Sequence, residues 1–578
     1  MIEKTIFNKV ADIYGEEDAH SITQEILVLI EKWKPSAPQY SQWVDETTSY
    51  LITYGDSFSR SGEKTLSSMK LFADKYLKGS ISNIHILPMF PYTSDDGFSV
   101  VDYRKVDEKL GDWEHLNALS ENFDLMYDCV INHISKSSDW FQAYLAGDEQ
   151  YQDYFVESDP SLDYSSVTRP RALPLLTPFS KASGETTHVW TTFSDDQIDI
   201  NFRSPKVLLE SIDILLMYAA NGGRSIRLDA IGFIWKGLNS TCIHLPEAHQ
   251  IIQLWRIIFD ETIPGALLIT ETNVPHKENI SYFGQGNEAH MVYQFPLPPL
   301  TLHAFMSQNS SVLTKWAKGL TEEAMMSLTQ GSKTTYFNFL ASHDGVGVRP
   351  TEGILSNEDR RLMCEQVERK GGRVNYKNNG DGTQSPYELN INYLSALTDA
   401  ADSDEFKAKK FLAAQSILLS FIGVPAIYYH SLLGSGNDIQ GMLESGINRR
   451  INREKFDLDE LEAELAEAGS LRQQVYSQMN ELVKLRKTQS AFSPLSSQAI
   501  LDLGDKVFAL QRGEGAETIR FAVNLSESSQ TVRLEESGHD LISNEPLENA
   551  FKLKPYQFVW LKQQACSAQE QSQIAKAQ

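Results

Sequence analysis

Three acidic residues, each at the end of an apolar stretch, are the part of this sequence best suited to catalysis. Asp229 ends SIRLD (225–229), Glu271 ends LLITE (267–271) and Asp344 ends FLASHD (339–344). Arg227 stands two positions before Asp229, so on a strand both side chains point to the same face. Burying such charges is costly unless they are paired. One interpretation of Arg227 and Asp229 is therefore a structural ion pair, and the other is an active site.

Three carboxylates at one place favour the active site. Their repulsion and partial burial separate their pKa values, and that separation assigns acid and base roles. Transfer of a sugar needs one ionised carboxylate to attack the anomeric carbon and one protonated carboxyl to donate to the departing oxygen. We expect Arg227 to keep Asp229 ionised as the nucleophile. Glu271 is then the acid and later the base, while Asp344 and His343 bind sugar hydroxyls and stabilise positive charge.

Eight short apolar segments, each followed by a helical stretch, must position these residues. The alternation predicts an α/β fold, a (β/α)8 TIM barrel with inserted subdomains and a small C-terminal antiparallel β domain. Active-site residues of such barrels lie where the strands end, and polar residues such as Asp56 and His133 stand there. The predicted strands span 49–56, 83–90, 124–133, 224–230, 265–272, 291–295, 335–344 and 424–429.

Two long interruptions and a change of pattern divide the chain. The stretch 456–487 is strongly helical, and its acidic run is typical of a solvated helix face. Long loops inside compact domains are commonly functional. The predicted division is a barrel (1–133, 191–344 and 396–490), an inserted subdomain (134–190), a long acceptor-site loop region (345–395), a C-terminal β domain (491–563) and a disordered tail (564–578).

The composition excludes several classes of partner. The chain has 578 residues and a net charge of −25, which argues against binding to nucleic acid or to an anionic membrane surface. An anionic ligand must be held by local arginines. The cysteines Cys129, Cys242, Cys364 and Cys566 form no CxxC pair, so neither a disulfide framework nor a metal site is expected. The polar N-terminus and the lack of a long apolar run predict a cytoplasmic protein.

Four short motifs resemble, in this order, the signature regions of the alpha-amylase superfamily: DCVINH (128–133), RSIRLDA (224–230), LLITET (267–272) and FLASHD (339–344). Within that superfamily the chain is similar to the sucrose phosphorylase subfamily. The similarity rests on LITYGDSF (51–58), HILPMFPYTSDDGFSVVDY (85–103), VTRPRALPLL (167–176), VWTTFSDDQIDINF (189–202), HDGVGV (343–348) and GINRRINRE (446–454).

The resemblance implies a role for each matching residue. It gives Asp229 as nucleophile, Glu271 as acid and base, and Asp344 as stabiliser of the transition state. It implies a glucose site of Asp56, His133, Arg227, His343 and Arg449, and phosphate contacts by Arg171 and Tyr387. Structural readings stay open, with His133 as a core histidine, Arg449 as a surface cation, and Arg169 and Arg171 as braces of a proline-rich turn. The resemblance implies no metal and no organic cofactor, a sugar and inorganic phosphate as partners, and compatibility with a homodimer.

The leaving group depends on the segment after the seventh strand. Members dedicated to sucrose tend to carry a loop resembling DLYQVN, whereas this chain has SPYELN (385–390), which includes Glu388. Arg373 and Lys377 nearby would favour an acidic leaving group such as glycerate, unless they are solvated loop cations. The prediction is a retaining α-glucoside phosphorylase that uses sucrose or a closely related glucoside. The alternatives are a glucosylglycerate phosphorylase, and a hydrolase or transglucosidase of the superfamily. A catalytically inactive binding protein is disfavoured because all three carboxylates are present.

Overall fold

The strands of the central barrel lie where the sequence predicts them. The computed structural model describes residues 2–563 apart from 37, 41–42, 172 and 380–382. All pairings within the barrel are parallel, and β1 closes it by pairing with both β16 and β3. The (β/α)8 fold class is therefore confirmed. The strands are β1 (Tyr50–Thr53), β3 (Asn83–Ile86), β4 (Asp124–Cys129), β9 (Gly223–Leu228), β10 (Leu267–Thr270), β11 (Met291–Tyr293), β12 (Thr335–Asn338) and β16 (Val424–Tyr428).

Helices cover the outside of the barrel and side chains fill its interior, so the strands are buried on both faces. Local signals fix where several of them begin. Asp112 accepts the backbone N–H groups of Glu114 and His115 at the start of α4, and prolines open α6 and α7. The covering helices are α3 (Thr65–Phe72), α4 (Trp113–Ser120), α6 (Pro205–Ala220), α7 (Pro246–Thr262), α9 (Leu297–Ser307), α10 (Ser311–Thr329), α13 (Asp404–Ser420) and α17 (Leu471–Arg486).

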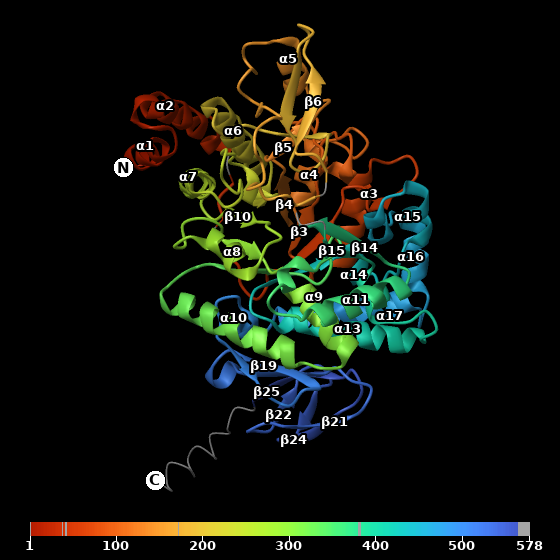
Figure 1. The fold of residues 1–578 in the computed structure, drawn as a ribbon. Helices are drawn as coiled ribbons and strands as arrows, with labels where there is room; N and C mark the ends of the chain where they lie inside the picture. Colours follow the sequence, from red (N-terminus) through yellow and green to blue (C-terminus); the bar gives the residue numbers. More distant parts are fainter. Residues whose placement is uncertain (1, 37, 41–42, 172, 380–382, 564–578) are drawn as a thin grey trace.

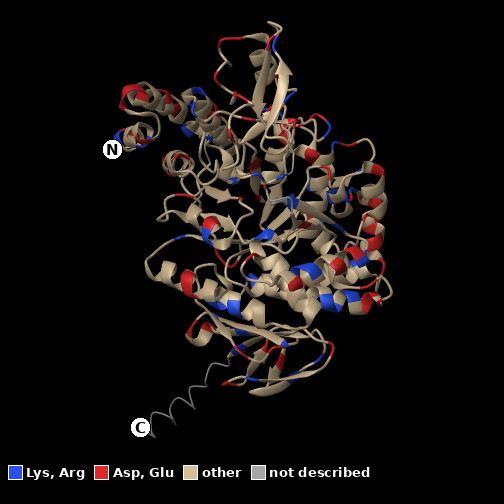
Figure 2. Cartoon of the chain, viewed as in Figure 1, with Lys and Arg blue, Asp and Glu red and all other residues tan. Residues whose placement is uncertain are grey.

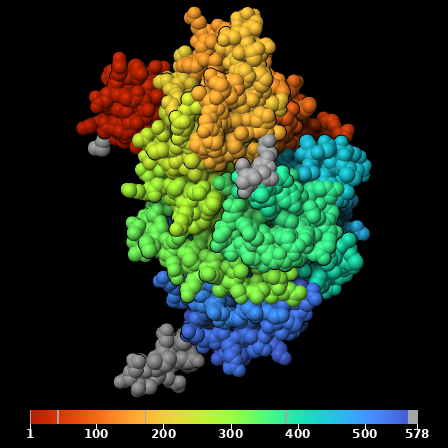
Figure 3. Space-filling view, in the orientation of Figure 1, coloured from red at the N-terminus to blue at the C-terminus, as the bar shows by residue number. Residues whose placement is uncertain are grey.

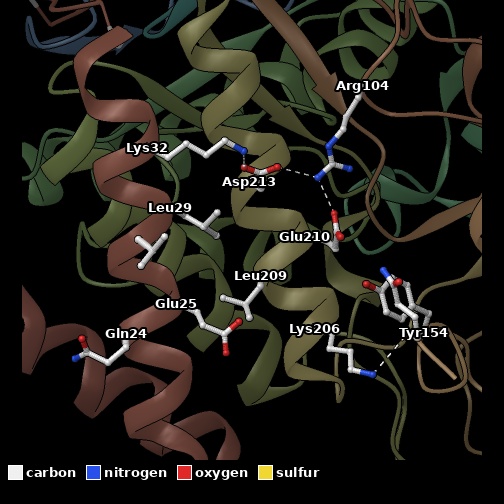
Figure 4. Close-up of a pocket in the computed structure, with 12 residues that line it drawn as sticks. Gln24, Glu25, Leu29, Lys32, Arg104, Tyr154, Lys206, Leu209, Glu210 and Asp213 are labelled. Carbon is white, nitrogen blue, oxygen red and sulfur yellow. Dashed lines mark hydrogen bonds and ion pairs between the residues drawn. The ribbon is translucent and has the colours of Figure 1, made fainter.

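A helical hairpin precedes the first strand and packs against α6 and α7. It consists of α1 (Ile2–Tyr14) and α2 (Glu16–Trp33). Figure 4 shows the contact between α2 and α6, where Lys32 pairs with Asp213 at 2.8 Å and Arg104 reaches both Glu210 (2.6 Å) and Asp213 (2.9 Å). A cavity of about 550 Å³ lies between these helices. Ion pairs this exposed contribute little stability, so apolar packing holds most of the hairpin.

The chain leaves the barrel after β4 and forms the inserted subdomain, at the top of Figure 1. Its elements are β5 (His133–Ser135), α5 (Asp139–Ala146), β6 (Leu176–Ser180), β7 (Thr186–Trp190) and β8 (Gln197–Asp199). The strand β8 pairs antiparallel with β5 and returns the chain to the barrel. The insertion therefore ends beyond residue 190, the predicted boundary.

Residues 345–395 are folded and do not form the predicted long loop. The strands β13 (Val346–Gly347), β14 (Arg373–Asn378) and β15 (Gln384–Asn390) form an antiparallel sheet in the order β13-β15-β14, next to α11 (Asn357–Arg369) and α12 (Tyr393–Leu397). A capping box between Ser356 and Asp359 starts α11. Residues 373–377 of β14 are exposed or half-buried and largely polar, so this sequence lacks the apolar contrast that marks the barrel strands.

The C-terminal domain is a six-stranded antiparallel sheet at the lower end of the molecule (Figures 1 and 3). It comprises β18 (Gln498–Leu501), β19 (Val507–Arg512), β20 (Ile519–Asn524), β25 (Phe558–Gln563), β22 (Gly538–Asp540) and β23 (Glu545–Leu547), with β21 (Gln530–Arg533) and β24 (Ala550–Leu553) as a separate pair. Trp560 Nε1 donates to Ser420 Oγ at 2.7 Å, which ties the sheet to α13. The tail predicted to be disordered, 564–578, lies outside the described residues.

The predicted helix 456–487 is divided into α16 (Leu458–Ala466) and α17 by a short break that contains Gly469. The carboxylates Asp459, Glu460 and Glu464 of α16 are exposed, and acidic residues recur along this helix at the right edge of Figure 2. In the described part of the chain, no helix is both long enough and apolar enough to cross a membrane.

Candidate active site

The predicted catalytic residues meet in a small cavity at the C-terminal ends of the barrel strands. Its volume is about 80 Å³, and the barrel, the inserted subdomain and the 345–395 region all contribute to its walls. The lining residues are Asp95, Phe98, His133, Arg171, Phe193, Gln197, Arg227, Asp229, Ala230, Glu271, Asn273, His343, Asp344, Tyr387, Glu388 and Arg449.

Arg227 is the centre of charge in this cavity. It is fully buried on β9, opposite Asp128 of β4 in the strand register. Its Nη1 donates to Asp128 and, at 2.8 Å, to Oδ1 of Asp229, while Nη2 lies 3.7 Å from Oε2 of Glu271. The guanidinium also faces the Tyr293 ring, 5.4 Å from its centroid. One cation thus holds three carboxylates from three different strand ends.

The pKa of Asp229 depends on burial and on the charge of Arg227, which is shared among three carboxylates. Burial raises the pKa of Asp229 to about 8; Arg227 opposes this rise, and the nearby carboxylates Glu271, Asp128 and Asp344 add to it. Burial also raises the pKa of Glu271. Contrary to our expectation, Arg227 does not by itself hold Asp229 ionised, because its charge is shared with Asp128 and Glu271. Because the charge of Glu271 raises the pKa of Asp229, the two carboxyls resist ionising together, and the closer contact of Arg227 with Asp229 favours the proton of the pair on Glu271.

The backbone just after β9 donates a hydrogen bond to Glu271, the second carboxyl of the pair. The Ala230 N–H donates to Oε2 of Glu271 at 3.2 Å. Ala230 has φ +47°, a left-handed conformation that costs a residue with a Cβ about 1–2 kcal/mol. The strain aims this N–H at the carboxyl that follows β10.

Asp344 is held by a different arginine. Arg449 Nη1 lies 2.7 Å from Oδ1 of Asp344, and its Nε and Nη2 bind both oxygens of Glu388 at 3.1 and 2.7 Å. Burial disfavours the charge on Asp344, but the cations around it, Arg449 first and then Arg453 and Arg227, together outweigh burial, and the pKa of Asp344 falls below its ordinary value. Asp344 is therefore ionised when the Asp229 and Glu271 pair still holds a proton.

Two buried histidines complete the wall. His343 stacks on Phe98 with ring centroids 4.8 Å apart, and its Nε2 lies 3.6 Å from Oδ1 of Asp344. His133 Nε2 lies 2.9 Å from the carbonyl oxygen of Phe98. Burial lowers the pKa of His133 to about 4 and that of His343 well below its ordinary value. Both imidazoles are neutral at pH 7 and can act as hydrogen-bond donors to a sugar.

Arg171 and Tyr387 reach the cavity from opposite sides, one from the inserted subdomain and one from β15. Among the described residues, Arg171 forms one loose ion pair, 3.7 Å from Oδ2 of Asp95, and it lies over the Phe193 ring. Burial raises the pKa of Tyr387 to about 12, so its hydroxyl keeps its proton. Arg227 and Arg449 are each committed to at least two carboxylates, which leaves Arg171 as the lining arginine best able to take an anion.

Three predicted site residues are not brought to the cavity. Asp56 is beside it, paired with Lys455 at 2.6 Å. Arg373 is exposed at the start of β14, where it donates to the carbonyl of Gly372. Lys377 lies further along β14 and pairs with Glu352 at 3.0 Å. Arg373 and Lys377, which we expected near the acceptor, do not line the cavity, and each is bound to its own neighbours.

The sequence interpretation missed several residues of the site. His85 on β3 lies 2.6 Å from Oδ2 of Asp128 and so braces the partner of Arg227. The signal in the sequence was that His85 and Asp128 are each a polar residue inside an otherwise largely apolar strand. Among the lining residues, Asp95, Phe98, Phe193, Gln197 and Asn273 carried no pattern of their own. Among the described residues, no group of three or more histidines, cysteines or acids could hold a metal ion.

Known proteins are similar to this chain in sequence and in fold. A model of the alpha-amylase catalytic domain matches residues 52–361. The chain is 44% identical over 567 residues to the glucosylglycerate phosphorylase of Escherichia coli, covering 97% of this chain and all of that protein. It is 28% identical over 515 residues to the sucrose phosphorylase of Streptococcus mutans, covering 84% and 98%. The crystal structure of sucrose 6F-phosphate phosphorylase from Thermoanaerobacter thermosaccharolyticum is similar in fold, with TM-score 0.72, 23% identity and coverage of 88% and 98%.

Proposed function

We propose a function from one premise: this chain belongs to the alpha-amylase family. The protein is a retaining phosphorylase that transfers a glucosyl unit from glucosylglycerate to inorganic phosphate. The products are α-glucose 1-phosphate and glycerate.

One observation carries the choice of substrate. The chain aligns with a glucosylglycerate phosphorylase at 44% identity over 97% of its length, whereas a sucrose phosphorylase reaches 28% over 84%. Sucrose, the first prediction from the sequence, is therefore less well supported than its alternative. An acidic leaving group in place of a neutral one also suits Arg171, since glycerate and phosphate are both anions that a guanidinium can bind.

The first half of the reaction uses Asp229 and Glu271 together. The Asp229 carboxylate attacks the anomeric carbon while Glu271 transfers its proton to the bridging oxygen, and glycerate leaves as the C–O bond breaks. Arg227 stays bonded to Asp229 and orients the attacking oxygen. Asp344, kept ionised by Arg449, stabilises the positive charge that develops at the sugar ring.

The second half reverses these roles. Phosphate enters beside Arg171 and Tyr387, and Glu271, now ionised, accepts a proton from the attacking phosphate hydroxyl. The phosphate oxygen bonds to the anomeric carbon and the Asp229 ester breaks. Two displacements at one carbon return the original configuration. The small volume of the cavity supports phosphorolysis, because it leaves little room for bulk water beside the glucosyl ester.

A panel of α-glucosides tests the proposal. The purified protein is incubated with glucosylglycerate, glucosylglycerol or sucrose, with and without phosphate, and glucose 1-phosphate and free glucose are measured. We expect glucose 1-phosphate from glucosylglycerate, at a kcat/KM at least tenfold above that for sucrose. A higher kcat/KM with sucrose would overturn the substrate, and glucose release independent of phosphate would identify a hydrolase instead.

A further inference from the structure

We propose that Lys236 is a positioning residue that fixes the tautomer of His133 through the side chain of Asn132. Lys236 itself does not reach the cavity that holds the carboxylates. It acts on a residue that does, and this inference depends on the proposed function only where turnover is measured.

Lys236 is a buried cation at the meeting point of three segments. It follows the turn after β9, and its side chain is 4% exposed. Its Nζ lies 2.7 Å from Oδ2 of Asp199 on β8 and 2.9 Å from Oδ1 of Asn132 at the end of the third barrel strand. Asp199 is further satisfied by the backbone N–H and the hydroxyl of Thr192. An ammonium group can only donate, so each of its partners must present an oxygen.

This requirement orients the amide of Asn132. With Oδ1 facing Lys236, the Nδ2 group faces His133 and lies 3.2 Å from its Nδ1. Amide Nδ2 is a donor, and a neutral imidazole has one donor nitrogen and one acceptor nitrogen. Nδ1 of His133 must therefore be the acceptor, and the proton is on Nε2. That proton points to the carbonyl oxygen of Phe98, at 2.9 Å.

A second arrangement would satisfy the histidine equally well if Lys236 were absent. Gln197 Nε2 lies 3.2 Å from His133 Nε2 and could donate to it if the proton were on Nδ1. Asn132 would then have to turn its oxygen toward His133 and its NH2 group toward Lys236. The NH2 group of Asn132 and the ammonium group of Lys236 are both donors, so they would face each other while buried. The hydrogen bond between these two side chains would be lost. The ammonium group of Lys236 thus selects one of the two networks, and in the selected network Gln197 Nε2 donates to the carbonyl oxygen of Phe98 at 3.1 Å rather than to His133.

The selected tautomer matters because of where His133 lies. It lines the cavity together with Arg227 and Asp229. Burial lowers its pKa to about 4, so it is neutral when the carboxylates react. With the proton on Nε2, His133 offers a donor at the cavity wall, and a sugar hydroxyl oxygen can replace the carbonyl of Phe98 as acceptor. The other tautomer would offer a lone pair instead.

Nitrogen NMR of histidine-labelled protein tests the tautomer directly and requires no substrate. Among the 13 histidines, the His133 signals are those lost in His133→Gln. In the wild type we expect long-range couplings typical of a protonated Nε2. In Lys236→Met we expect a mixture of tautomers or a protonated Nδ1. The matched control is Asp199→Asn, which breaks the same buried ion pair but leaves Lys236 bonded to Asn132, so it should keep Nε2–H. A protonated Nδ1 in the wild type would overturn the proposal, as would identical tautomers in both variants.

Asn132→Asp keeps the test valid if Lys236→Met does not fold. It retains both charges of the ion pair and replaces the amide by a group that only accepts, so His133 must then carry its proton on Nδ1. An unchanged Nε2–H in this variant would also overturn the proposal.

Turnover provides an independent readout. Loss of one donor to the sugar should raise KM for the glucosyl donor about tenfold in Lys236→Met, with a smaller change in Asp199→Asn and recovery in Lys236→Arg. The surface control Lys206→Met, on α6, should leave KM unchanged. A KM change of the same size in Lys236→Met and Asp199→Asn would indicate a merely structural role. A protein inactive on every glucoside would refute the proposed function and leave the NMR result standing.

Discussion

Glu388 and Arg449 form a two-pronged ion pair, with Nε 3.1 Å from Oε1 and Nη2 2.7 Å from Oε2. The remaining nitrogen, Nη1, binds Asp344 at 2.7 Å. The glutamate side chain is 2% exposed. A residue of the 345–395 region therefore fixes the arginine that keeps a barrel carboxylate ionised.

Removing one partner of this pair should destabilise the fold. Glu388→Ala leaves Arg449 short of a buried counter-charge, which costs about 3–5 kcal/mol of unfolding free energy. Glu388→Gln keeps one acceptor oxygen and should cost less than half as much. Urea unfolding of both variants measures the difference. Equal losses in the two variants would contradict a role for the charge.

Asp229→Asn should abolish glucosyl transfer. An amide cannot form the ester with the anomeric carbon, so kcat should fall by about four orders of magnitude or more. A slow fluorinated glucosyl donor should leave an adduct on residue 229 of the wild type, read by mass spectrometry of its peptides, and none in the variant. An adduct on another residue would refute Asp229 as the nucleophile.

The same variant should be more stable than the wild type at neutral and alkaline pH. Folding raises the pKa of both coupled carboxyls, that of Asp229 from 3.8 to about 8, so the folded state is penalised wherever both carboxyls are ionised in the unfolded chain and the folded pair still holds one proton. The penalty is absent below pH 3.8, grows as pH rises and is complete above about 8. Asp229→Asn removes it, and we expect a gain of about 1–2 kcal/mol at pH 8 that vanishes toward pH 4. Denaturant unfolding of the wild type and the variant across this pH range measures the gain. A gain that stayed constant with pH would contradict the prediction.

Glu271→Gln should separate the two chemical roles of the carboxyl pair. Transfer from a glucoside, whose leaving oxygen needs a proton, should fall about a thousandfold, while transfer from glucosyl fluoride should be largely retained. Because the Glu271 charge raises the pKa of Asp229, its removal lowers that pKa. The acidic limb of the glucosyl fluoride rate should then move to lower pH. An acidic limb that moves to higher pH, or equal losses with both donors, would argue against Glu271 as the acid.

Arg171→Ala should weaken the use of phosphate more than it weakens hydrolysis. Loss of the guanidinium should raise KM for phosphate at least tenfold. Arg373→Ala is the matched control, because Arg373 is a cation of the same type that lies outside the cavity. Initial rates against phosphate concentration distinguish the two. If both variants kept the wild-type KM, phosphate would have to bind elsewhere.

The barrel could be read from the sequence because its strands are buried on both faces. The strand NIHI (83–86) is buried at all four positions, and Ile84 and Ile86 alternate in it with the polar residues Asn83 and His85. Such a buried segment stands out from the amphipathic helices around it. The strands of the 345–395 region could not be read in this way. RVNYKN (373–378) is half solvated, so its composition is that of a loop.

The site shows a similar division. Carboxylates that end apolar strands, such as Asp229 and Glu271, are visible in the sequence because charge is costly there. The cluster of Lys236, Asn132 and Asp199 is not visible in the sequence. Its members are far apart along the chain, and each looks like an ordinary polar residue. Only the fold reveals that Lys236 is buried between the other two.

The burial of α13 bears on how this chain could be shortened. Every residue from Phe411 to Ser420 is buried, with the barrel on one flank and the C-terminal sheet on the other. A gene truncated after the last barrel helix would leave that second flank bare, with the apolar side chains of α13 in water. Such a fragment would self-associate before it could turn over any sugar, so the terminal sheet is a condition of the barrel's solubility.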